Sequence, residues 1–142
     1  MKDGAAEVAE RVAGQCVAFR SRRLARLVTR LYDEALRGHG MTVAQFGLLA
    51  AIQESAPVQP VELGDAIGMA KSTLSRNLDR LAEAGWVSRE DLDRGRGQEV
   101  RLTPQGQRAL VVAMPAWEEA QAAARVRLGD DTQELLDRLL TE

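Results

Sequence analysis

The sequence predicts a mainly α-helical fold that carries one small β-hairpin. Apolar residues recur at three- and four-residue steps over most of the chain, as in amphipathic helices. Two short helical segments flank the turn formed by Gly68, Met69 and Ala70. Two short strand-like runs, 86–89 and 98–102, then enclose a turn rich in Gly, Asp and Arg. A helix pair followed directly by a hairpin indicates a winged helix-turn-helix domain flanked by N- and C-terminal helices.

The first predicted helix runs from about Ala6 to Leu36, with Gly14 marking either a kink or the true start. One side is apolar and the other is basic. We interpret the basic side as a solvated face, while contact with a DNA backbone and ion pairs between subunits remain alternatives. The basic residues are Arg20, Arg22, Arg23, Arg26 and Arg30.

Residues 38–40, Gly-His-Gly, end that helix, and Thr42 to Gln45 has the T-x-x-Q form of a capping box. The next helix extends to about Glu54. Its expected core residues are Phe46, Leu49, Ala50 and Ile52. The Pro-rich segment 57–60 is too short for an interior strand, although a brief edge pairing against the hairpin is compatible with it.

The helix pair requires a residue without bulk on its first helix and a turn residue that tolerates positive φ, which Gly64 and Gly68 supply. On the second helix, the leucines at 74, 78 and 81 share one face and predict a buried stripe. The opposite face carries small hydroxyls and then arginine, which suits close approach to base edges. A solvated face in an ordinary bundle is the simpler alternative. The outward residues are Ser72, Ser75, Arg76, Asp79 and Arg80.

Gly85 ends the second helix, and the hairpin that follows places Val100 and Leu102 on one face. Arg94 and Arg96 lie at its tip between glycines. Arginine on a narrow hairpin is typical of minor-groove insertion. Charged loop tips are common in proteins, so the helix pair beside the hairpin is what favours DNA contact.

After the hairpin, Thr103 and Pro104 form a helix start, and this helix continues to about Leu128 with a bend near Pro115. Asp130 is expected to cap the last helix. That helix carries an apolar stripe that needs a partner, and packing between two subunits explains it better than packing within one. The stripe consists of Leu135, Leu136, Leu139 and Leu140.

The composition fits one globular domain of 142 residues with 28% charged residues. The net charge of −2 argues against a free-standing DNA-binding module, but acidic residues elsewhere can offset a basic face. No apolar run reaches the ~20 residues that span a bilayer. With no signal-peptide pattern either, the sequence predicts a cytoplasmic protein without membrane contact.

Catalysis is not supported by the sequence. The single histidine, His39, stands between two glycines, and no Cys/His cluster offers a metal site. The phosphate-binding glycine motifs of nucleotide-dependent enzymes are also missing. We therefore expect neither an enzyme nor a cofactor or metal.

The sequence resembles the MarR family of bacterial transcriptional regulators. The resemblance rests on the run 68–81, on Gly85-Trp86-Val87, on Arg89, Asp93 and Arg96, and on the run V-R-L-T-P-Q-G at 100–106. Two positions differ from the family pattern. Arg94 stands where the family usually has an acidic residue of the hairpin, called the wing, and Ala70 stands where a helix-capping Ser or Asp is common.

This resemblance implies a homodimer that binds a pseudo-palindromic operator in double-stranded DNA, with a small-molecule effector as a further implied partner. The whole chain, 1–142, would form one MarR-like domain. Residues 1–37 and 104–142 would supply dimerisation helices, and 42–103 the DNA-binding lobe.

We accordingly expect a sequence-specific regulator, acting as a repressor, whose two recognition helices lie ~34 Å apart. Candidate base-reading residues are Ser72, Thr73, Ser75 and Arg76. Lys71 and Arg80 are candidates for phosphate contact, and Arg94 and Arg96 for the wing.

Two alternatives remain. Cys16, with arginines one or two turns away, is similar in position to the reactive cysteine of thiol-based sensors in the family, although a small structural cysteine is our preferred interpretation. The second alternative is a winged-helix module that binds proteins rather than DNA, which would explain the acidic balance directly.

Overall fold

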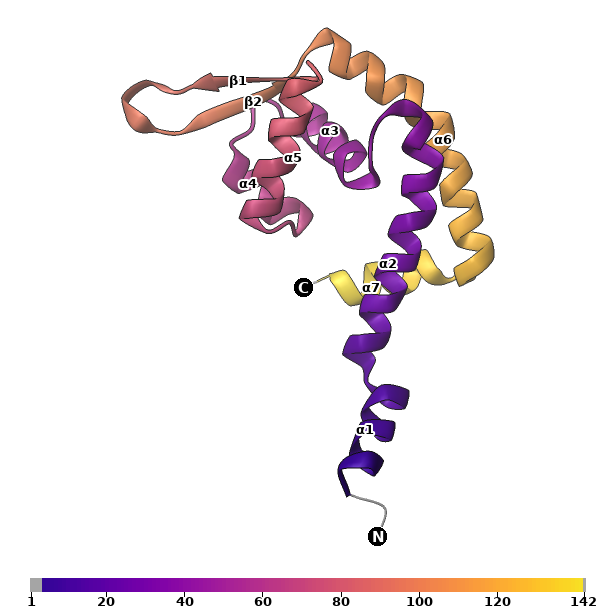
Figure 1. Cartoon of the computed structure of the whole chain (residues 1–142). Helices are drawn as coiled ribbons and strands as arrows, with labels where there is room; N and C mark the ends of the chain where they lie inside the picture. The colour runs from indigo at the N-terminus through magenta and orange to yellow at the C-terminus, as the bar shows by residue number, and fades with distance from the viewer. Residues whose placement is uncertain (1–3, 142) are drawn as a thin grey trace.

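A computed structural model describes residues 4–141 and confirms a mainly α-helical fold with one hairpin. Helices α3, α4 and α5 form a lobe with the hairpin, while α2 and α6 lie side by side along its flank (Figure 1). The elements are α1 (Gly4–Gln15), α2 (Val17–Leu36), η1 (Arg37–His39), α3 (Val43–Ser55), α4 (Pro60–Ile67), α5 (Lys71–Glu83), β1 (Val87–Asp91), η2 (Asp93–Gly95), β2 (Gln98–Leu102), α6 (Pro104–Leu128) and α7 (Thr132–Leu140).

The N-terminal helix is divided, which corrects the prediction of one helix kinked or begun at Gly14. Gly14 lies within α1, and the break is at Cys16, whose backbone is extended with φ −66° and ψ 111°. The Cys16 amide still donates to the carbonyl of Val12, and its carbonyl accepts from Arg20. Cys16 therefore ends one helix and begins the next.

The lobe's core is built on α3, which begins at the predicted capping box. The Thr42 side chain accepts from the Gln45 amide, and the Gln45 side chain accepts from the Thr42 amide. Phe46, Leu49 and Ile52 are buried as expected. Ala50 is exposed, contrary to expectation, because its face of α3 points away from the other helices.

The turn between α4 and α5 has the predicted geometry. Gly68 adopts φ +65° and ends α4, and a Cβ on Gly64 would stand 3.2 Å from the Leu74 side chain. Leu74 and its stripe partners Leu78 and Leu81 are buried. The two helices thus cross closely because Gly64 leaves room for Leu74.

The hairpin is a two-stranded antiparallel sheet in which Val87 pairs with Leu102 and Asp91 with Gln98. Val58 forms an isolated bridge with Val100, so the suggested edge pairing of segment 57–60 is confirmed. Val58, Val87 and Val100 are all buried. The base of the hairpin is therefore part of the lobe's core.

The hairpin leads directly into α6, whose predicted N-cap is confirmed. The Thr103 hydroxyl accepts from the Gly106 amide and donates to the Gly85 carbonyl. A Cβ on Gly106 would stand 2.0 Å from the Trp86 carbonyl oxygen. Glycine at 106 therefore lets α6 pass against the chain that enters β1.

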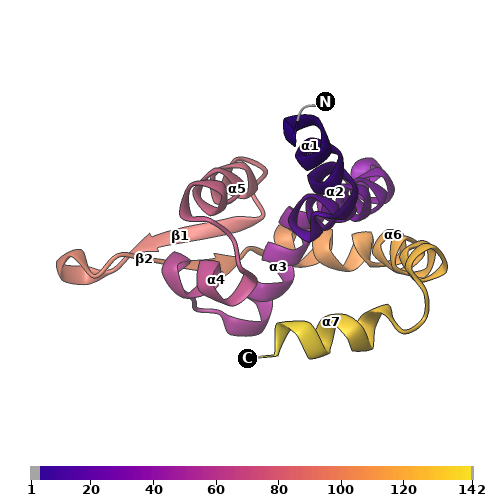
Figure 2. The ribbon, with the colours of Figure 1, turned by 90° about the horizontal axis from the view of Figure 1, so that it is seen from below.

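The last helix begins at Thr132, with Asp131 rather than the predicted Asp130 at the N-cap position and without a side-chain capping bond. Although α7 crosses α2 in the view of Figure 1, Figure 2 shows the two helices apart. Neither α1 nor α7 contains a buried residue, and both expose apolar side chains. Within residues 4–141, no helix is long and apolar enough to cross a membrane.

Candidate nucleic-acid interface

The outer face of α5 is open to solvent and carries most of the residues predicted to read bases. Ser72, Arg76 and Arg80 follow one another at four-residue steps, so they lie along one line of the helix. Ser75 and Lys71 are also exposed, whereas Thr73 is half-buried at the edge of this face. The structure therefore brings the α5 candidates together on one surface.

The N-terminus of α5 has no side-chain cap. Ala70 occupies the N-cap position in an extended conformation and offers no oxygen to the first-turn amides. These amides retain the partial positive charge of a helix N-terminus, which favours a phosphate over a cation. With Ala70 at the N-cap, no capping side chain occupies the first-turn amides of α5, so these amides are free to contact a phosphate.

The wing, residues 87–102, extends away from the helices as a long hairpin (Figure 1). Between its strands, Arg94 lies in η2 and Arg96 directly follows η2, and both are exposed. Arg94 has φ +62°, a left-handed conformation that is uncommon for a residue with a Cβ. The Arg96 Nε donates to the backbone carbonyl of Asp93 at 3.2 Å. Arg96 is thus oriented by a backbone oxygen of the turn, and no carboxylate among the described residues forms an ion pair with it.

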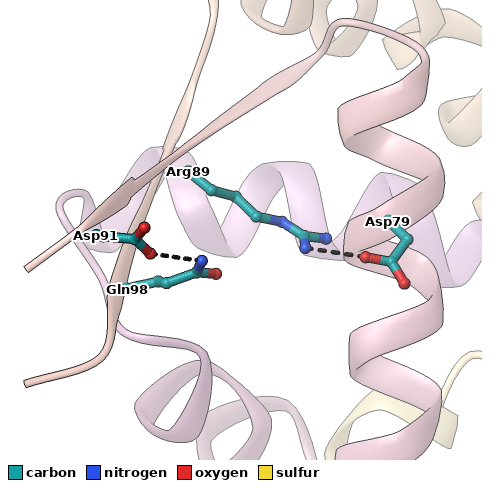
Figure 3. A network of polar contacts seen from close by, with 4 residues as sticks. All are labelled: Asp79, Arg89, Asp91 and Gln98. Atoms are coloured by element: carbon teal, nitrogen blue, oxygen red, sulfur yellow. Dashed lines mark hydrogen bonds and ion pairs between the residues drawn. The ribbon is translucent and has the colours of Figure 1, made fainter. Parts of the chain in front are cut away.

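Arg89 on β1 was not among the predicted site residues. Its Nη1 lies 2.9 Å from a carboxylate oxygen of Asp79 on α5, and Figure 3 shows the side chain crossing from the strand to the helix. The Arg89 side chain is 26% exposed and that of Asp79 is 57% exposed. A signal was available in the sequence, because Arg89 stands two residues after Val87 and alternation places both on the inward face of the strand.

A pocket of about 320 Å³ lies between α4, α5 and the wing. Leu74, Ser75 and Leu78 line it from α5, and Arg89 and Gln98 line it from the wing. Gln98 is held to the opposite strand by a 2.8 Å hydrogen bond from its Nε2 to Asp91 (Figure 3). Beyond its buried base, the wing is therefore separated from α5 by open volume rather than by packed side chains.

The lobe is joined to the flanking helices through polar and aromatic contacts. The Val43 amide at the start of α3 donates to the Asp33 carboxylate of α2 at 2.8 Å. Phe46 of α3 stacks on Trp117 of α6 with ring centroids 6.2 Å apart. The Tyr32 hydroxyl of α2 donates to Gln121 of α6, which joins the two flanking helices to each other. The position of the lobe is thus tied to α2 and α6.

Cys16 does not belong to the surface formed by α5 and the wing. It is half-buried at the break between α1 and α2, so the single subunit does not bury it as the small core residue that we preferred. The redox alternative rests on the position of Cys16 in the chain and on the arginines one or two turns away, and it is not favoured.

An exposed second helix beside an arginine-tipped hairpin defines the chain as a winged helix-turn-helix protein. Comparison with known proteins places it more narrowly. The sequence profile of the MarR family matches residues 39–97. The chain belongs to the MarR family of transcriptional regulators, and its relatives are regulators rather than enzymes.

Two solved structures are similar over nearly the whole chain. The M. tuberculosis transcriptional regulator MosR in complex with DNA is 32% identical, with a TM-score of 0.76 over 88% of this chain and 93% of that one. A mutant of MarR from E. coli complexed with operator DNA is 26% identical, with a TM-score of 0.78 over 92% and 98% of the two chains. Among curated proteins, the transcriptional repressor MprA of Escherichia coli K12 is 27% identical over 118 residues, which cover 75% of this chain and 67% of MprA.

Proposed function

We propose that this regulator binds a pseudo-palindromic operator in double-stranded DNA as a homodimer and represses transcription there. The observation that carries the proposal is the outer face of α5, which presents hydroxyl and guanidinium groups to solvent and is covered by no other element among residues 4–141. The DNA complexes of MosR and MarR support the same use of the fold.

The chemistry of each candidate suggests its part. Ser72, Thr73, Ser75 and Arg76 occupy the first half of α5, the part of a recognition helix that reaches base edges. Lys71 and Arg80 would contact phosphates at the two ends of that stretch. Arg94 and Arg96 would enter the neighbouring minor groove, where negative potential attracts arginine.

A second copy of the chain is the proposed cover for the terminal helices. On α7, Leu139 and Leu140 are 66% and 78% exposed, and on the N-terminal side Val8 and Phe19 are 62% and 52% exposed. Such apolar stripes are stable in water only when a partner covers them. We therefore assign dimerisation to segments 1–37 and 104–142 and DNA binding to 42–103; residues 1–3 and 142 of that division lie outside the described residues.

Occupancy of the operator would repress transcription. The similarity to the transcriptional repressor MprA supports repression rather than activation. Release by a small molecule would operate through the spacing of the two lobes. Because Asp33 ties the lobe to α2 and Trp117 ties it to α6, a ligand that prefers one arrangement of these helices would change that spacing.

Selection of bound fragments from genomic DNA tests the proposal and yields the half-site spacing. On the selected site, Arg76→Ala should weaken specific binding more than nonspecific binding, while Arg96→Ala should lower affinity and the slope of affinity against salt. Arg101→Ala, an exposed change on β2 outside the candidate DNA-binding residues, is the control with the same loss of charge. Recovery of no enriched fragment, with weak binding that salt does not affect, would instead favour a protein-binding module.

A further inference from the structure

We propose that Arg89 is a positioning residue for DNA recognition, which holds the wing at a fixed angle to the recognition helix by pairing with Asp79. The inference rests on the proposed function, because it concerns how two DNA-reading elements are kept in register. The ion pair is the only one that joins the wing to α5 within residues 4–141, and no side-chain hydrogen bond joins the two elements there.

The wing has a fixed base and a less supported outer half. At the base, Val87 and Val100 are buried, and Val100 also pairs with Val58. Arg89 stands opposite Val100 in the register, at the point where buried positions end. From Glu90 to Gly97 most residues are exposed, so packing does not determine the direction of the tip.

Arg89 crosses the space that packing leaves open. Its side chain lines the 320 Å³ pocket between the wing and α5, and its guanidinium reaches the helix at Asp79 (Figure 3). Asp79 lies one residue before Arg80 and three after Arg76. The wing is therefore connected to the part of α5 that carries the DNA-reading arginines.

A contribution to folding stability does not explain why an arginine stands at position 89. Its Nε and Nη2 atoms are buried and have no hydrogen-bond partner among residues 4–141, and buried donors left unpaired reduce stability. Its one partner, Asp79, is mostly exposed, and such pairs contribute little to folding. A variant with an apolar side chain at position 89 should therefore be at least as stable as the wild-type protein.

A fixed angle matters because the two elements read different grooves. The recognition helix enters the major groove and the wing the adjacent minor groove, so the distance between them must match the duplex. Without the ion pair between Arg89 and Asp79, the wing would sample more orientations in the free protein. Ordering the wing on DNA would then make the binding free energy less favourable. Affinity for the full operator and discrimination between half-site spacings should both decrease.

The test compares Arg89→Met with Arg101→Met. Both changes remove one positive charge from a wing strand. Arg101, however, pairs with Glu99 of its own strand at 3.6 Å and with no other carboxylate in the described part of the chain. We expect both variants to keep the wild-type melting temperature or exceed it. Arg89→Met should bind the selected operator about tenfold more weakly than Arg101→Met, a difference of about 1.4 kcal/mol.

Three further measurements separate positioning from a general effect of the mutation. One base pair inserted between the sequence contacted by α5 and the sequence contacted by the wing should lower the operator affinity of wild type. The same insertion should have little effect on the affinity of Arg89→Met. Arg89→Lys, which keeps a cation opposite Asp79, should restore most of both properties. In an Asp79→Asn background, the Arg89→Met change should have little additional effect, because the two residues act as a pair.

Nuclear relaxation of the wing amides provides a readout that needs no DNA. Order parameters at residues 91–97 should fall in Arg89→Met and remain at wild-type values in Arg101→Met. Equal order parameters in the two variants, or equal operator affinity, would overturn the assignment. Failure of wild type to select any operator would overturn the proposed function instead, and the relaxation result would still decide whether Arg89 orders the wing.

Discussion

The terminal leucines provide the most direct test of dimerisation. The double variant Leu139→Ala/Leu140→Ala removes three carbons from each side chain while keeping a residue that favours helix. These side chains are 66% and 78% exposed in the single subunit. At ~0.8 kcal/mol per buried carbon, complete coverage by a partner corresponds to about 3.5 kcal/mol per subunit.

A two-fold symmetric interface contains this contribution twice, so the dimer would lose about 7 kcal/mol, or about 3.5 kcal/mol if the partner covers half of the exposed area. The dissociation constant of the dimer should therefore rise by about 300-fold to 10⁵-fold. Sedimentation velocity over a dilution series measures it. Val61→Ala, on an α4 residue of the DNA-binding lobe that is 67% exposed, is the control and should leave the constant unchanged. A change of less than about tenfold in the double variant would refute the assignment of α7 to the interface.

Three further predictions concern the stability of the fold. Gly106→Ala should lower the unfolding free energy by at least about 2 kcal/mol, because the new Cβ would meet the Trp86 carbonyl at 2.0 Å. Gly47→Ala, in open space on α3, should raise it by about 0.5–1 kcal/mol, and urea unfolding that gave the same sign for both would contradict this reasoning. Burial raises the pKa of Tyr32 above its usual value near 10, and the nearby Arg125 lowers it by less. The unfolded chain then ionises first, so stability should decrease as the pH rises above about 10. Tyr32→Phe should show a smaller decrease, and identical pH profiles would exclude this contribution.

The sequence alone was sufficient to predict the features that depend on neighbours in the chain. The capping box at Thr42, the turn at Gly68 and the cap at Thr103 involve groups a few residues apart, so their sequence patterns nearly specify their geometry. The stripe of Leu74, Leu78 and Leu81 was equally readable, because a helix converts spacing into a face. The tip of the wing and the outer face of α5 were predicted in the same way.

Other features depended on how the elements pack, and only the tertiary structure decided them. The exposure of Ala50 depends on which face of α3 meets the lobe, and α1 and α2 separate at Cys16 rather than at the glycine that local preference indicated. Above all, the contact of Arg89 with Asp79 depends on the angle between the hairpin and the recognition helix. Burial of Val58, Val87 and Val100 places the base of the hairpin and so brings Arg89 within reach of Asp79. Val58 is separated from the two strand residues in the sequence, and only folding brings the three together.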